Sequence, residues 1–359
     1  MKQRIALLYG IDDQSREFEV AATRALIAGA ESALAGRGWE VATIEVKDDL
    51  IGALKPYSPD DWLIFNLCEG SPSQAFYYAK TARILSVMGY IYTGADHVAL
   101  DATQFKWKMK SVLQQCGVPT PRWVVFEQAA DIGPRALSND FFPAIVKPAN
   151  EHCSYGITRE SVVMDAAEAQ AQAERIIAQF NGPVLIEEFL DSAEYNVSVW
   201  GSVQPAVLGI STMTYEAFED VRDRLCTFEA KWDPSSEPYR RIPAVCPAPV
   251  SPALKAEIEA VTVAAYTALG CRDYGRIDLR LKDGWPMVLD VNPNCDVSPD
   301  GGFAVAAAAA GLSYGEMMEQ IALFALERSQ QPAYMPARMP VECSVGAWMP
   351  QPESVLATP

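Results

Sequence analysis

The sequence predicts a mixed α/β protein whose first part is a parallel sheet wrapped by helices. Three observations support this prediction. Half of the 359 residues are hydrophobic, which is enough to bury a sizeable core. Short apolar strands alternate with amphipathic helical stretches through the first third of the chain. Later segments alternate apolar and polar residues with the period of two that half-buried strands show.

The first elements follow from their hydrophobic pattern. An apolar strand at 5–9 precedes an amphipathic helix predicted from Ser15 to Ala35, which two glycines close. Two more strands are predicted at 41–46 and 62–67. No GxGxxG motif follows the first strand, so the sequence lacks the fingerprint of a dinucleotide-binding site.

The remaining elements begin with a helix predicted from Thr103 to Cys116 and a proline-containing turn after it. Further strands are predicted at 122–126, 143–148, 160–164, 184–190, 194–201, 206–212, 276–281 and 286–292. Further helices are predicted at 166–180, 251–268, 303–310 and 314–327. Residues 329–359 are rich in proline and methionine without periodicity, so we expect an irregular tail there.

Charge and composition exclude several classes of function. The chain has 46 acidic and 29 basic residues, and its net charge of −17 repels nucleic-acid backbones and anionic lipid. No signal peptide or 18-residue apolar run is present, so we expect a soluble, cytoplasmic protein. The eight cysteines form no CxxC pair, and we expect them to be reduced thiols. With only two histidines, catalysis should depend on Lys, Arg, Asp, Glu and Asn side chains.

The pair of strands around residue 284 carries polar side chains on one face. Period two places Arg276, Asp278 and Arg280 together on the first strand, and Asp290 and Asn292 together on the second. If an odd-numbered loop is centred on Gly284, Asp278 lies opposite Asp290 and Arg276 lies opposite Asn292. Two facing carboxylates need a cation between them, and oxygen ligands favour Mg²⁺ or Mn²⁺ completed by phosphate oxygens. The alternative is that Asp278 pairs with an arginine of its own strand.

Two other strand ends suggest a nucleotide. Lys147 follows an apolar run where a loop begins, a position suited to a phosphate, although a lone lysine there is usually solvated. The segment 187–190 ends another strand, whose backbone could bind a flat ring such as adenine. The alternative is a charged edge that only prevents aggregation. His97 is expected at a helix start and is assigned no chemistry.

Taken in order, these segments resemble the ATP-grasp enzymes, and among them the D-alanine–D-alanine ligase family. The matching motifs are YGIDDQSRE, FNLCEG, IYTGADHVALDATQFKWKMK, IVKPANEHCSYGI, VLIEEFLDSAEYNVSVWG, FEAKWD, GCRDYGRIDL and VLDVNPN. Eight motifs in the family's order are far more specific than any one of them. The resemblance implies an ATP-grasp fold with an N-terminal Rossmann-like domain at 1–100, a central subdomain at 101–188 and a C-terminal subdomain at 189–328.

The resemblance also implies site residues. Contacts with the phosphates, adenine and ribose of ATP fall on Lys106, Lys147, Ser154, Glu187, Glu188, Leu190, Glu194 and Lys231. The ligands of two Mg²⁺ ions fall on Asp278, Asp290 and Asn292, with Asp290 standing where the family has glutamate. The catalytic roles fall on Lys231, which reaches the terminal phosphate, and on Arg276, which stabilises an acyl-phosphate and a tetrahedral intermediate.

The departures from the family pattern gather on the substrate side of the site. The altered or candidate substrate residues are Ser15, Glu69, His152, Cys153, Trp232, Asp296, Asp300 and Gly301. Of these, Glu69 and Asp296 carry a charge that could hold an ammonium group. A retained ATP half beside an altered substrate half predicts the same reaction class on other substrates.

The expected activity is therefore an ATP-dependent carboxylate–amine ligase that forms an amide through an acyl-phosphate, with small-molecule acids and amines as partners. One alternative is an authentic D-alanine–D-alanine ligase, and another is a non-catalytic nucleotide-binding protein. A third is a carboxylate kinase that loses its acyl-phosphate to water. A homodimer is compatible with the resemblance, since the family is often dimeric.

Overall fold

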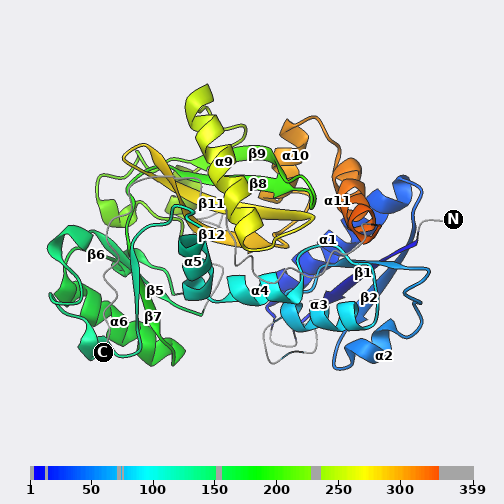
Figure 1. Ribbon diagram of the computed structural model, residues 1–359, viewed down its shortest axis with the longest axis horizontal. Coiled ribbons are helices and arrows are strands. Elements are labelled where there is room, and N and C mark those ends of the chain that lie inside the picture. Colours follow the sequence, from blue (N-terminus) through cyan, green and yellow to red (C-terminus); the bar gives the residue numbers. More distant parts are fainter. Residues whose placement is uncertain are drawn as a thin grey trace.

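A computed structural model describes residues 4–12, 15–70, 74, 77–150, 156–227 and 236–330. Within these residues the chain forms a parallel sheet and two antiparallel sheets, which lie in a row with their covering helices (Figure 1). The predicted mixed α/β class is confirmed. No helix in the described part of the chain is long and apolar enough to cross a membrane.

The first sheet is parallel, with strand order β2-β1-β3, as the alternation of strands and helices predicted. Its strands are β1 (Arg4–Gly10), β2 (Glu40–Val46) and β3 (Leu63–Asn66). Its helices are α1 (Glu17–Gly36), α2 (Leu50–Leu54), α3 (Tyr78–Val87) and α4 (His97–Gln104). Ile5 and Leu7 of β1 pack in one core with α1, and Ala6 and Leu8 pack in another with α2 to α4, because successive strand residues face opposite sides.

The second sheet has the order β4-β7-β5-β6 and is antiparallel. Its strands are β4 (Trp123–Phe126), β5 (Ala144–Pro148), β6 (Val162–Val163) and β7 (Val184–Glu188). Helix α6 (Ala166–Phe180) covers it, as predicted. This helix begins where the Asp165 carboxylate accepts the backbone N–H groups of Ala167 and Glu168, and it ends at Asn181 in the left-handed conformation.

The third sheet is antiparallel and has the order β10-β9-β8-β11-β12. Its strands are β8 (Glu194–Trp200), β9 (Ala206–Met213), β10 (Ala244–Val245), β11 (Tyr274–Lys282) and β12 (Trp285–Pro293). Further helices are α5 (Lys106–Gln115), α8 (Glu237–Arg241), α9 (Pro252–Ala268), α10 (Gly302–Ala309) and α11 (Tyr314–Ser329).

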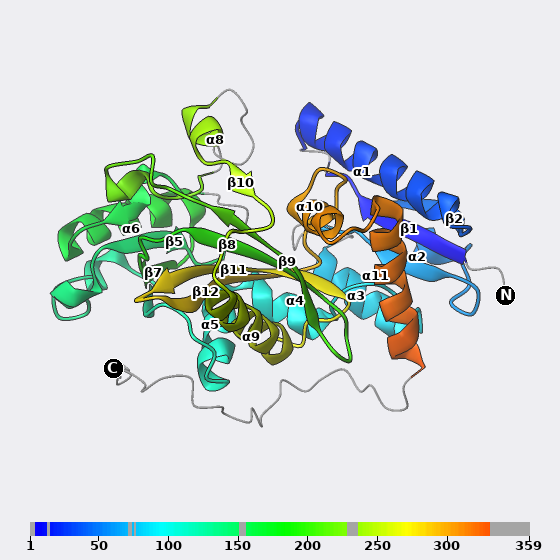
Figure 2. The ribbon, with the colours of Figure 1, turned by 90° about the horizontal axis from the view of Figure 1, so that it is seen from above.

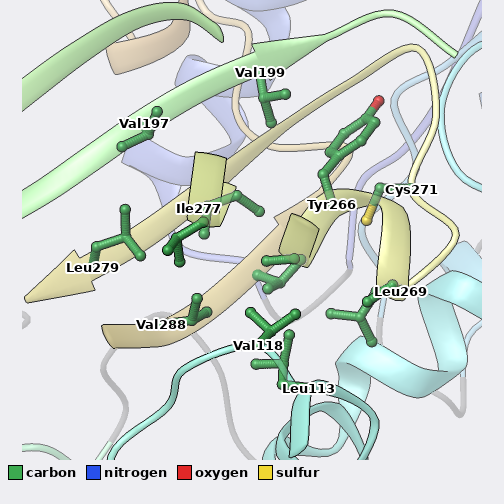
Figure 3. Close-up of a cluster of buried hydrophobic side chains, with 14 of the residues drawn as sticks. Leu113, Val118, Val197, Val199, Tyr266, Leu269, Cys271, Ile277, Leu279 and Val288 are labelled. Carbon is green, nitrogen blue, oxygen red and sulfur yellow. The ribbon is translucent and has the colours of Figure 1, made fainter. Parts of the chain in front are cut away.

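One face of the third sheet is a hydrophobic core against α5 and α9 (Figure 3). Ile277 and Leu279 of β11 point into this core, beside Val197 of β8 and Val288 of β12 (Figure 3). Because strand residues alternate, the polar residues between them emerge on the opposite face. The core therefore fixes which way the predicted site residues point.

The β11–β12 register agrees with the predicted pairing but not with its assumed cause. Asp278 lies opposite Asp290, and Arg276 lies opposite Asn292, as expected. The loop is not odd-numbered, since Lys282 already pairs with Trp285 across a two-residue turn. A register shift just after Asp278 skips one residue of β12 and restores the pairing.

Two other expectations are corrected. The helix predicted at 103–116 is divided, because Phe105 has extended backbone angles (φ −109°, ψ 113°) and separates α4 from α5. Cys116 is disulfide-bonded, so the expectation of reduced thiols is wrong at that position. The helix start at His97 is confirmed, because the Asp96 carboxylate accepts the backbone N–H groups of residues 98 and 99.

A buried ion pair joins the first sheet to the third. The Asp273 side chain, fully buried and in a left-handed backbone conformation (φ 64°), accepts from Arg328 of α11 at 2.9 and 3.2 Å. It also accepts the Gly94 N–H at 2.8 Å and the Ser202 hydroxyl at 2.6 Å. Arg328 donates in turn to the carbonyl of Tyr92 at 2.9 Å. Helix α11 lies beside α1 and β1 and shares their core (Figure 2), so this cluster holds three distant segments together.

Candidate active site

The polar face of β11 and β12 centres on the Asp278 carboxylate. Arg276 donates to it through Nε at 2.7 Å and through Nη2 at 3.0 Å. Asn196 and Asn292 donate their side-chain amides to it at 2.9 and 3.1 Å. The carboxylate raises the pKa of the Arg276 guanidinium well above its usual range. Asp278 therefore lies opposite Asp290, as predicted, and also pairs with the arginine of its own strand, which was the alternative.

The predicted metal ligands supply oxygen atoms but do not form a closed cage. Asp278, Asp290 and Asn292 offer two carboxylates and an amide from two adjacent strands. Among the described residues, no group of three His, Cys, Asp or Glu side chains is arranged to hold a metal ion. Mg²⁺ commonly takes one or two carboxylates and completes its shell with substrate phosphates and water. The donor set therefore fits an ion that binds together with a nucleotide.

A cluster of charged side chains lies where the second and third sheets meet. Lys147 at the end of β5 donates to Glu187 of β7 at 2.7 Å, so the structure brings two predicted residues together. Lys110 of α5, which was not predicted, contacts the other oxygen of Glu187. Burial alone would raise the pKa of the Glu187 carboxyl, but the two lysines hold it below its usual value. Lys106 is the first residue of α5, and its backbone N–H donates to the Ala149 carbonyl at 3.3 Å.

Leu190 and Glu194, two of the predicted ATP-binding residues, are held by a second cation that was not predicted, Arg280. Its guanidinium donates to the Leu190 carbonyl at 2.7 Å and to the Glu194 carboxylate at 3.2 and 3.3 Å. The ring of Tyr215 stacks on it, and the Tyr215 hydroxyl donates to Glu194 at 3.3 Å. Arg280 lies directly opposite Glu194 in the β8–β11 ladder, so the register of these two strands brings the pair together.

The side chain of Glu188, in the predicted adenine-binding segment 187–190, is held by two cations. Lys282 of β11 donates to both of its oxygens at 2.7 and 2.8 Å, and Arg122 donates at 3.4 Å. The backbone N–H of Glu188 donates to the Arg122 carbonyl at 2.9 Å. These contacts link the second sheet to the third beside the predicted adenine-binding segment.

On the substrate side, Asp296 lies close enough to Glu69 to affect the pKa of the Glu69 carboxyl. Glu69 follows β3 and Asp296 follows β12, and both side chains are exposed. Desolvation, and to a smaller extent repulsion from Asp296, raises the pKa of the Glu69 carboxyl to about 7. The same aspartate contributes to the raised pKa of Tyr314, although burial is the larger cause, and the Tyr314 hydroxyl is buried without a partner.

Gly301 joins this group, because a Cβ there would lie 2.8 Å from an Asp296 oxygen, and it caps the start of α10. Ser298 fixes Asp296 by donating its N–H and hydroxyl at 2.8 and 2.6 Å. Asp300 is exposed beside them. Ser15 lies in the turn before α1, where its N–H donates to the Asp12 carbonyl.

Five predicted site residues lie outside the described residues: His152, Cys153, Ser154, Lys231 and Trp232. Their positions relative to the cluster are therefore untested. The residues that the sequence analysis missed, Lys110 and Arg280, are cations with side chains only 1% and 4% exposed. Each forms an ion pair with an acidic side chain: Lys110 with Glu187, and Arg280 with Glu194.

Comparison with known proteins is consistent with this geometry. Residues 112–322 match the profile of the family described as D-ala D-ala ligase C-terminus. An uncharacterized protein, y4sG of Sinorhizobium fredii, is 30% identical over 297 residues, which cover 81% of this chain and 84% of that protein. A D-alanine–D-alanine ligase of Moorella thermoacetica is 28% identical over 334 residues, covering 90% and 99% of the two chains.

Solved structures show the same fold. The D-alanine–D-alanine ligase from Bacillus anthracis complexed with ATP superposes with a TM-score of 0.69 at 20% identity, covering 91% of this chain and 98% of that chain. The D-alanine–D-alanine ligase from Coxiella burnetii superposes with a TM-score of 0.68 at 15% identity, covering 92% and 95%.

Proposed function

The chain belongs to the D-alanine–D-alanine ligase family of ATP-grasp proteins, and on this premise we propose that it joins a carboxylate to an amine at the expense of ATP. The observation that carries the proposal is the arrangement around Asp278. The guanidinium of Arg276, fixed by Asp278, lies beside Asp290 and Asn292 on the adjacent strand, whose side-chain oxygens could bind a metal ion. A protein that only bound a nucleotide would have no need of a full set of metal ligands together with an arginine placed for an acyl-phosphate.

The proposed reaction has two steps. A substrate carboxylate attacks the terminal phosphorus of ATP, the bond to the bridging oxygen breaks, and an acyl-phosphate and ADP form. An amine then attacks the acyl carbon, loses a proton, and expels phosphate to leave an amide. Catalysis of this kind depends on positioning and on neutralising charge, which suits a site made of lysines, arginines and carboxylates.

Each cluster of the site has a proposed part in this reaction. Lys147 contacts the phosphates, and Glu194, held by Arg280, contacts the ribose. Arg276 stabilises the negative charge that develops on the acyl-phosphate and on the tetrahedral intermediate. Asp278, Asp290 and Asn292 would hold Mg²⁺, which supplies further neutralisation of the phosphate oxygens when bound. Lys231 keeps the role that the resemblance implies.

We propose substrates other than D-alanine, because the residues that depart from the family pattern gather on the substrate side, where Glu69 lies near Asp296. Two carboxylates at such a position repel each other until a cation binds, and a substrate ammonium group would supply that cation. Gly301 at the start of α10 would leave backbone N–H groups open to the carboxylate of the same substrate. An amino acid or an amine-bearing small acid meets both requirements.

The test of the proposal is phosphate release from MgATP by the purified protein, measured against single and paired D- and L-amino acids, with mass spectrometry of every product. Release with an amino-acid pair other than D-alanine is the expected result. Release with D-alanine alone, giving its dipeptide, would show an authentic D-alanine–D-alanine ligase. Phosphate release without an amide product would show a carboxylate kinase. ATP binding without turnover on any acid or amine would support the non-catalytic alternative.

Glu69→Gln should raise the KM of the amine-bearing substrate about tenfold, because the variant replaces a charge-assisted hydrogen bond by a neutral one. The value of kcat should change little. In the unaltered protein, KM should also rise as the pH falls through about 7, since protonation removes the Glu69 charge. Initial rates between pH 5.5 and 8.5 measure both effects. A KM that is the same in both proteins at every pH would exclude Glu69 from the substrate site.

A further inference from the structure

Two lysines share one buried carboxylate in the proposed nucleotide site. The Glu187 side chain is 1% exposed and contacts Lys110 through one oxygen and Lys147 through the other. The Lys110 side chain is itself 1% exposed, whereas that of Lys147 is 15% exposed. One carboxylate against two ammonium groups leaves this cluster, Lys110–Glu187–Lys147, with a net charge of +1.

Lys110 is fixed in place by a second acceptor. It donates to the Thr120 hydroxyl at 2.8 Å, and Thr120 donates to the Val288 carbonyl of β12 at 2.8 Å. Its Nζ is thus directed at Glu187 and at the strand that carries Asp290. Lys147 instead lies at the end of β5, where the partly exposed ammonium group can meet a ligand.

An excess positive charge in a desolvated cluster is costly unless an anion comes to it. Without Lys110, Glu187 and Lys147 would form a neutral pair, and Lys147 would offer little attraction to an anion. Burial lowers the pKa of Lys110, and repulsion from Lys147 adds to this, whereas Glu187 and Asp290 oppose the shift.

We propose that Lys110 is a positioning residue that neutralises Glu187 and so leaves the charge of Lys147 available to a nucleotide phosphate. The inference rests on the proposed ATP-dependent function and adds a residue that acts on ATP without contacting it. It predicts that affinity for the phosphates depends on the net charge of the cluster and not on Lys110 as such.

The test compares the dissociation constants of ATP and adenosine, measured by calorimetry without the other substrates. Lys110→Met removes one charge, and we expect ATP to bind about tenfold more weakly while adenosine binds as before. Glu187→Gln keeps at least one positive charge, so its preference for ATP over adenosine should equal or exceed that of the unaltered protein. Combining the two substitutions restores a net charge of +1, and the preference should return to within about threefold of the original.

Thr120→Val is the matched control, because it removes a hydrogen bond of Lys110 but no charge. It should leave the preference for ATP unchanged, whatever it does to the melting temperature. If Lys110→Met does not fold, a Glu187→Gln preference below the original contradicts the proposal. If all variants prefer ATP over adenosine equally, the proposed role of Lys110 is overturned, but the proposed function is not. Failure of the unaltered protein to bind ATP overturns the proposed function as well.

Discussion

Arg276→Met should lower kcat by about 10²–10³-fold while the protein still binds ATP, because removing one fixed donor to a developing oxyanion costs about 3–4 kcal/mol of transition-state stabilisation. Arg276 makes its two bonds to Asp278 from the polar face of β11, so its guanidinium is already oriented before a substrate arrives. The measurement is kcat on the substrate pair that the phosphate-release screen identifies, with the ATP dissociation constant from calorimetry.

Two further results make the Arg276 experiment specific. Arg276→Lys keeps the positive charge but cannot make the bidentate contact of a guanidinium, so it should recover only part of the lost rate. Lys255→Met is a control that also removes one cation, since Lys255 pairs with Glu259 on helix α9. Its kcat should stay within a few-fold of the original. A normal kcat in Arg276→Met would contradict the proposed role of this arginine.

The part of the site on β11 and β12 could be predicted from the sequence because period two determines which residues share a face. The apolar residues Ile277 and Leu279 had to enter the core, and this directs Arg276 and Asp278 to the other side (Figure 3). The register was right for a reason that the sequence does not reveal, since a bulge compensated for the even-numbered turn. A bulge depends on the packing of neighbouring strands and has no reliable local pattern.

Lys110 and Arg280 could not be predicted in the same way. A lysine on a helix and an arginine on a strand are normally solvated, and only their acidic partners, Glu187 and Glu194, distinguish these two. Those pairs join segments 77 and 86 residues apart, which no periodicity describes. Glu69 and Asp296, 227 residues apart, were selected through the family resemblance, and only the fold shows that they are neighbours.

The parallel sheet was predicted because strands and helices alternate, a pattern that is local in sequence. The return of α11 to the core of that sheet is different, since it depends on contacts between residues roughly 300 positions apart (Figure 2). The division of α4 from α5 at Phe105 was also missed, because nothing in an aromatic residue itself forbids a helix.

Arg328→Met should destabilise the protein by about 3–5 kcal/mol, the usual effect of removing one partner from a buried ion pair. The Asp273 side chain would keep the Gly94 and Ser202 donors but lose the arginine that balances its charge. A drop in the urea midpoint at an unchanged slope would measure the loss.

A matched surface pair and a double variant separate this effect from a general loss of packing. Arg4→Met removes an ion pair with Glu40 in which both side chains are more than a third exposed, and it should cost no more than about 1 kcal/mol. Adding Asp273→Asn to Arg328→Met removes the uncompensated charge, so the double variant should regain part of the lost stability. If the double variant is instead less stable by the sum of the two single losses, the charge of Asp273 is not what Arg328 balances. Recovery would show that α11 is held to the first and third sheets by charge compensation at Asp273, in addition to the apolar face that it buries beside α1.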